Sequence, residues 1–186
     1  MHETDNILRI LEETKKAIEE KNYAKISYLS NQTINTASLT QDSDNIAVAV
    51  VVYSLSKIFE REHYKQSPEY EKIKKIIIYS LECSIEDLEK NDLNEFRKDF
   101  ENIRTCIKKI SGKLKEYILE VFRKAKINKA SRIYEHGISM EQTAKLLGIT
   151  MFELADYAGK TGISDVPESK TLDTKSRIKL VEEIFG

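Results

Sequence analysis

Apolar residues recur three or four positions apart over the first 126 residues, and this spacing limits the fold more than any other feature. In the first such segment it places Ile7, Leu11 and Ile18 on one side of a helix. With 6 Gly and 2 Pro in 186 residues, the chain has few turn-forming residues, which favours long helices over many short strands. The sequence therefore predicts an all-α protein with an N-terminal antiparallel helical bundle. Helices are expected over 5–20, 23–39, 42–63, 67–91, 92–110 and 113–126.

The third of these segments is apolar almost all round. From Ile46 to Tyr53 it is short and β-branched, as a buried strand would be. Leu55, Ile58 and Phe59 continue the helical spacing beyond that stretch, so a central buried helix is predicted.

The second segment carries no charge from Ile26 to Gln41 but has ten Ser, Thr, Asn or Gln side chains. Such side chains are weak helix formers, so packing must hold this helix in place. Two interpretations stay open. The polar groups pair with neighbouring helices, or they form a charge-free docking surface for a ligand or partner.

Downstream of Asn128 the expected helices become short: 129–136, 139–147 and 150–159. Gly137 and Gly148 stand where helices end in the left-handed conformation, and Ser139 and Thr150 stand where the next helices are capped. A helix-turn-helix needs a small contact residue, a glycine turn and apolar residues that lock its second helix. The matching positions are Ala144, Gly148, Leu147, Ile149, Leu154 and Tyr157. The spacing predicts a small C-terminal helix-turn-helix domain.

This segment resembles the helix-turn-helix of small prokaryotic antitoxin-like proteins that are often paired with PIN-domain toxins. In that family a Tyr-x-x-Gly-x-Ile-Ser lead-in precedes an Ala-x-x-Leu-Gly-Ile-Ser turn. A second helix with an aromatic residue, Glu and Leu follows. The resemblance covers about 35 residues and implies a regulatory or antitoxin-like role. The matching residues are Tyr134, Gly137, Ile138, Ser139, Ala144, Leu147, Gly148, Ile149, Thr150, Phe152, Glu153, Leu154 and Gly162.

The expected outward face of the second short helix fits base reading poorly. It presents Met151, Phe152, Glu153 and Asp156, whereas reading helices usually carry cationic and amide side chains. Lys160 is its one cation. We therefore expect Met151, Phe152 and Asp156 to contact a partner protein, or the two apolar residues to pack against the bundle.

The basic block of the chain comes immediately before this motif. Residues 111–136 carry seven basic and three acidic side chains, a net charge of +4, whereas the whole chain has −1. Lys126, Lys129 and Arg132 recur every three residues, a spacing suited to one strand of phosphates. The alternative is a solvated helix face. The candidate nucleic-acid-binding residues are Arg123, Lys124, Lys126, Lys129, Arg132 and Lys160.

The sequence contains no recognisable catalytic or cofactor signature. The three histidines are scattered, and no phosphate-binding glycine loop, nucleophile elbow or metal-ligand spacing occurs. The N-terminus has no apolar signal segment, and the apolar stretch 46–55 is too short to cross a bilayer. We expect a cytoplasmic, non-enzymatic protein without metal or cofactor and without a membrane partner.

The predicted domains are 1–126, the bundle, and 127–186, the helix-turn-helix with a C-terminal amphipathic helix. That last helix has Ile178, Val181, Ile184 and Phe185 on one face, which would pack on its own domain or on a second subunit of a homodimer. Two functions are compatible with this organisation. One is a regulator associated with DNA or structured RNA, with a partner-binding bundle. The other is a non-catalytic adaptor or antitoxin-like module that docks through the helix-turn-helix.

Overall fold

The computed structural model describes residues 3–61, 68–108 and 112–161. Every regular element within these ranges is a helix, so the all-α prediction is confirmed. The helices are α1 (Thr4–Glu19), α2 (Tyr23–Thr40), α3 (Ser43–Glu60), α4 (Pro68–Glu89), α5 (Leu93–Lys108), α6 (Gly112–Glu135), α7 (Met140–Leu147) and α8 (Met151–Thr161). The amphipathic helix expected near the C-terminus lies outside the described residues.

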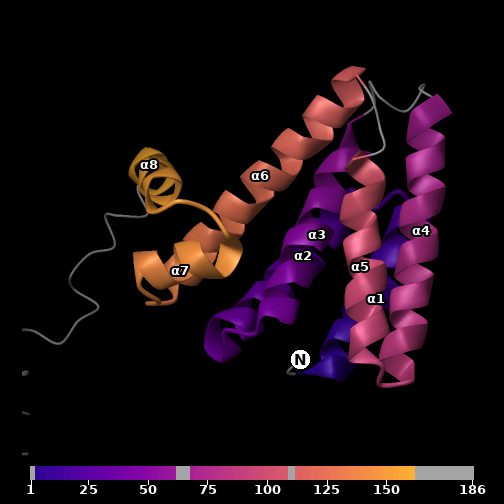
Figure 1. Cartoon of the computed structure of the whole chain (residues 1–186), viewed down its shortest axis with the longest axis horizontal. Helices are drawn as coiled ribbons and strands as arrows, with labels where there is room; N and C mark the ends of the chain where they lie inside the picture. Colours follow the sequence, from indigo (N-terminus) through magenta and orange to yellow (C-terminus); the bar gives the residue numbers. More distant parts are fainter. Residues whose placement is uncertain (1–2, 62–67, 109–111, 162–186) are drawn as a thin grey trace, which may run out of the picture.

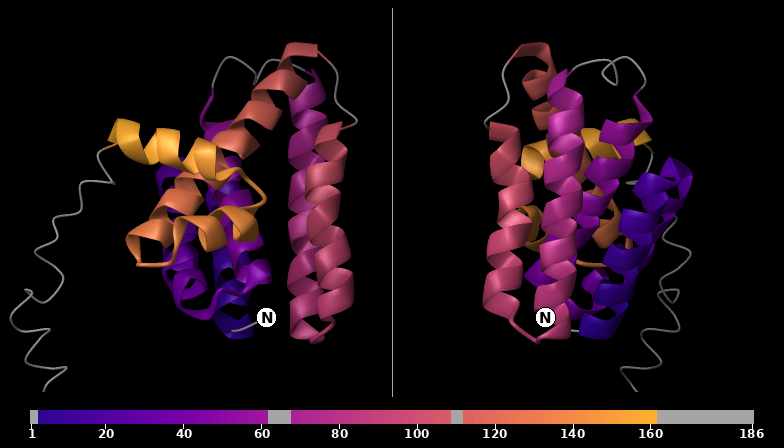
Figure 2. Two further views of the ribbon diagram at one scale, coloured as in Figure 1. Left: turned by 60° about the vertical axis from the view of Figure 1, so that its left-hand side comes forward. Right: turned by 90° about the vertical axis from the view of Figure 1, so that its right-hand side faces the viewer.

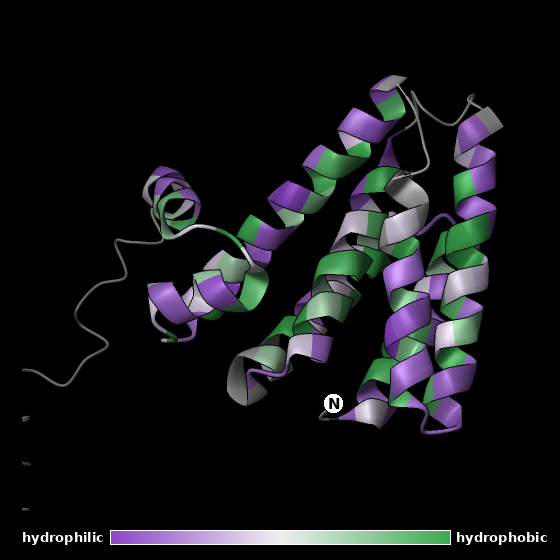
Figure 3. Ribbon diagram, viewed as in Figure 1, coloured by the Kyte–Doolittle hydropathy of each residue, from purple (hydrophilic) through white to green (hydrophobic). Residues whose placement is uncertain are grey.

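α3 lies at the centre of the bundle. The α4–α5 hairpin is at one end of the molecule, and α7 and α8 are at the other (Figure 1; Figure 2). Hydrophobic residues predominate along α3 (Figure 3), and Val52 and Leu55 are fully buried there, so the central buried helix is confirmed. The main core is formed by α1 to α5 with the first half of α6.

α6 is a single helix through residues 127 and 128, so the prediction of two helices that end and begin there is wrong. Its two halves bury different faces. Ile118 and Val121 contribute to the main core, whereas Ala130 and Ile133 belong to a second core. The second core also contains residues of α2, α3, α7 and α8. The division into two domains at residue 126 stays a prediction, but the chain has no break at that point.

Three polar side chains of α2 form hydrogen bonds to neighbouring helices. Ser30 Oγ donates to the Ala49 carbonyl of α3 at 2.7 Å. Gln32 Oε1 accepts from Arg9 of α1 at 3.1 Å, and Asn31 Oδ1 accepts from Lys129 of α6 at 2.8 Å. These contacts support the first of the two interpretations of the charge-free segment.

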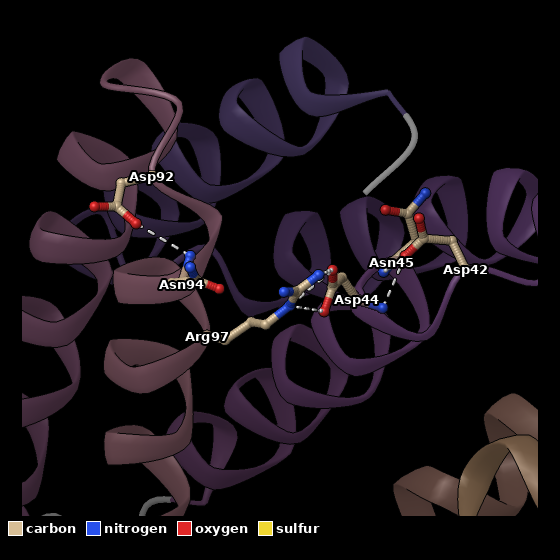
Figure 4. Close-up of polar contacts among 6 residues, drawn as sticks. All are labelled: Asp42, Asp44, Asn45, Asp92, Asn94 and Arg97. Carbon is tan, nitrogen blue, oxygen red and sulfur yellow. Dashed lines mark hydrogen bonds and ion pairs between the residues drawn. The ribbon is translucent and has the colours of Figure 1, made fainter.

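An ion pair joins the α4–α5 hairpin to the start of α3. The Arg97 guanidinium donates from Nε to Asp44 Oδ1 at 3.0 Å and from Nη2 to Asp44 Oδ2 at 2.8 Å (Figure 4). Asp42 caps α3 by accepting from the backbone of Asp44 and Asn45, and Asp92 caps α5 in the same way. The Arg97–Asp44 ion pair therefore joins the start of α3 to α5.

Candidate interaction surface on α6 and α8

α7 and α8 lie where the sequence spacing predicts two short helices and a turn. Ser139 caps α7 by accepting from the Gln142 N–H at 3.2 Å. α7 ends at Gly148, whose φ of 60° is in the left-handed region that favours glycine. Ala144 is buried, and Leu154 is fully buried in the second core. α8 is therefore fixed on the body of the protein by its inner face.

The N-terminus of α8 is closed by a capping box. The Thr150 N–H donates to Glu153 Oε2 at 3.0 Å, and the Glu153 N–H donates to Thr150 Oγ1 at 3.1 Å. Arg123 of α6 donates to the same carboxylate at 3.2 Å. The hydrogen bonds from Thr150, followed by that from Arg123, lower the pKa of Glu153. Glu153, expected to face outward, thus holds α8 in place.

Two large apolar side chains remain exposed on the first turn of α8. The exposed fraction is 81% for Phe152 and 53% for Met151. Burial of both side chains against the bundle, one of the two predicted alternatives, is not what the structure shows. Asp156, one turn later, is exposed and pairs with Lys160 at 2.7 Å. The three candidate partner-binding residues therefore lie on the outer face of one anchored helix.

No protein-family model, curated protein or solved structure matches this chain. In the part of the chain that the structure describes, no three His, Cys, Asp or Glu side chains gather closely enough to hold a metal ion. Within the same ranges no helix combines the length and the apolar character that crossing a membrane requires.

Lys129 does not belong to the predicted basic surface. Its exposed fraction is 0%, so the prediction that it contacts phosphates beside Lys126 and Arg132 is wrong. The ammonium donates to Asn31 Oδ1 at 2.8 Å and lies 4.3 Å from the ring centre of Tyr53. Burial, together with the nearby Arg132 charge, lowers the pKa of Lys129 to about 7.

The exposed cations among the predicted residues pair with acids nearby. Arg123 contacts Glu153 and Glu120, and Lys124 also contacts Glu120. Arg132 pairs with Glu135 at 3.2 Å. Lys126 is half-buried and lines a cavity beside α3. The candidate residues consequently do not form an unbroken row of exposed positive charge.

Sequence reasoning missed a groove of about 1330 Å³ between α3, α6 and α8. Aromatic residues from all three helices line it, and Phe152 is at its α8 edge. Its charged lining is mixed, with six Lys or Arg and five Asp or Glu residues. Because these residues come from helices far apart in the sequence, no local spacing could indicate the groove. A polyanion would gain little net attraction there.

Proposed function

We propose that this protein is a non-catalytic interaction module that docks on a partner protein through the first turn of α8. The observation that carries the proposal is the exposure of Phe152 beside Met151 on a helix whose position is fixed. Leu154 anchors the inner face of that helix, and the Thr150–Glu153 capping box closes its start. Because the backbone that carries Phe152 is already fixed, docking would order little additional backbone, which favours tight binding.

These two side chains would fit into an apolar pocket on a partner protein. An aromatic side chain buries about 150–250 Å² when it is covered. At roughly 25 cal/mol per Å², covering Phe152 would contribute several kcal/mol. Adjacent aromatic and Met side chains are typical of residues that dominate protein interfaces. This proposal is in line with the antitoxin-like resemblance of the segment, since antitoxins act by binding a protein.

Nucleic-acid association is the second candidate function. It is favoured by the two short helices with their tight turn, beside a helix that carries Arg123, Lys124 and Arg132. Their ion pairs are exposed and therefore weak, so phosphates could compete for these side chains. It ranks second because Lys129 is buried and acids alternate with the remaining cations.

A salt titration separates the two functions. We expect no saturable binding of mixed-sequence duplex DNA or a structured RNA hairpin at about 50 mM salt, measured by fluorescence anisotropy. The opposite result would be binding that weakens steeply with salt and is lost in the triple variant Arg123→Glu, Lys124→Glu, Arg132→Glu. The matched control reverses Lys72, Lys75 and Lys90, which are exposed on α4 and the turn that follows it. Binding of that kind would make nucleic-acid association the leading function.

A further inference from the structure

A cavity of about 310 Å³ opens between the N-terminal half of α3, the middle of α5, α6 and the end of α7. Its volume is at the lower end of the range of small-molecule sites. Since a water molecule takes about 30 Å³ of liquid volume, the space suits a ligand of roughly ten non-hydrogen atoms.

The inner wall of this cavity is apolar. Phe96 and Phe100 of α5 are stacked, with ring centres 5.3 Å apart, and both are buried. Val50 of α3, Phe122 of α6 and Leu147 of α7 complete the wall. An apolar group that entered would replace water along these side chains, which is favourable.

The rim of the cavity has no net charge. Asp44 and Arg97 form the ion pair shown in Figure 4, and Glu101 and Lys126 provide one further charge of each sign. A charged ligand would therefore lose hydration without a net Coulomb gain. An uncharged hydroxyl or carbonyl group can hydrogen-bond at this rim with a smaller loss of hydration.

We propose that this cavity binds an uncharged amphipathic small molecule of about ten non-hydrogen atoms. Its apolar body lies on Phe96 and Phe100, and its single polar group is at the Asp44–Arg97 rim. The cavity wall includes both α5 and α7, so the bound molecule contacts the hairpin at one end of the bundle and the helix that precedes α8. This inference does not depend on the proposed docking function.

The test uses the full chain with methyl-labelled leucine and three eight-carbon probes: 1-octanol, octanoate and octylammonium. Nuclear magnetic resonance titration with 1-octanol should give saturable shifts of the Leu146 and Leu147 methyl signals. The Leu11 signals, from a residue that does not line the cavity, should stay unchanged. Octanoate and octylammonium should bind at least about tenfold more weakly, because the cavity compensates neither charge.

Ala47→Trp blocks the opening in this design, because Ala47 is exposed and lines the cavity. It should weaken 1-octanol binding at least about tenfold. Ala155→Trp, at an exposed alanine of α8, is the matched control and should leave binding unchanged. If circular dichroism shows that the Ala47→Trp protein is unfolded, Ser43→Trp, one turn earlier on α3, serves as the blocking variant instead. Absence of saturable shifts, equal binding of a charged probe, or binding that persists in the folded blocked variant would overturn the proposal.

Discussion

Replacing Lys129 by Met is expected to raise the free energy of unfolding at pH 7 by about 2–4 kcal/mol. The ammonium is fully buried and has one amide oxygen and one aromatic ring beside it. A fall of the pKa from 10.5 to about 7 in the folded state means that folding opposes protonation. At pH 7 this costs the folded state about 4 kcal/mol. Met removes that cost and keeps most of the packing, while Asn31, which is exposed, can bond to water.

The same residue should make stability depend on pH. Between pH 7 and 10.5 the unfolded chain keeps the Lys129 proton that the folded chain has lost, so the unfolded state binds more protons and stability rises with pH. The stability advantage of Lys129→Met over the wild type should therefore shrink by about 1 kcal/mol per pH unit between pH 7.5 and 9.5. Urea denaturation of both proteins across this range measures the difference.

Lys145→Met, at an exposed position of α7, is the control for the loss of one positive charge. Its difference from the wild type should stay constant over the same pH range. If Lys129→Met were less stable than the wild type at pH 7, or if the difference between them did not change with pH, the ammonium would be well solvated inside the protein. The account of its burial would then be wrong.

Leu154→Ala is expected to lower the free energy of unfolding by about 3 kcal/mol. Leu154 is fully buried in the second core, which it shares with residues of α2, α3, α6 and α7. Removing its side chain leaves a cavity among all of these helices. We therefore expect the whole chain to unfold in one transition at lower urea concentration, as measured by far-ultraviolet circular dichroism.

Leu119→Ala provides the comparison, because Leu119 of α6 is exposed, and its effect should stay within about 0.5 kcal/mol. Hydrogen exchange of α3 tests whether the coupling reaches the bundle. If Leu154→Ala increased exchange in α7 and α8 but left that of α3 unchanged, the C-terminal helices would form an independent unit. The predicted division at residue 126 would then gain support, and the shared core would not couple the two parts.

The outer helices α1, α4 and α5 could be predicted because each one buries a single face, which leaves a regular apolar spacing in the sequence. The buried helix α3 is apolar almost all round, and it could be told from a strand because the helical spacing continues to Leu55, Ile58 and Phe59.

α6 was harder to predict as a single helix because its buried face changes along its length. Ile118 and Val121 are in the main core, whereas Ala130 and Ile133 are in the second core. That change interrupts the apolar spacing near Asn128, and the interruption resembles the end of a helix.

The burial of Lys129 had a signal in the sequence. Lys129 lies four residues after Ala125 and four before Ile133, so all three share one helix face. Ala125 and Ile133 are both apolar, and this spacing along one continuous helix indicates that Lys129 faces inward. The spacing of Lys126, Lys129 and Arg132 is compatible with a charged row, but the apolar residues four positions on either side of Lys129 indicate an inward position.

The sequence indicates the local contacts of Glu153 but not the contacts that join distant helices. A Thr with a Glu three residues later is a capping-box pattern, and Thr150 with Glu153 satisfies it. The pairing of Arg123 with Glu153, and the cavity that residues of both α5 and α7 line, involve residues 30 or more positions apart. Such contacts depend on how the helices pack, which local spacing does not determine.

The most direct test of docking through α8 is a comparison of the partners captured by three full-length tagged proteins from the native host, with and without nuclease. They are the wild type, the double variant Met151→Ser, Phe152→Ser, and the control Ile76→Ser, Tyr79→Ser, which removes exposed apolar groups from α4. We expect one protein to be recovered in near-stoichiometric amount by the wild type and the control. Nuclease should not release it, and the α8 variant should recover at least about tenfold less. Equal recovery by the α8 variant, or loss of the partner after nuclease treatment, would contradict the account.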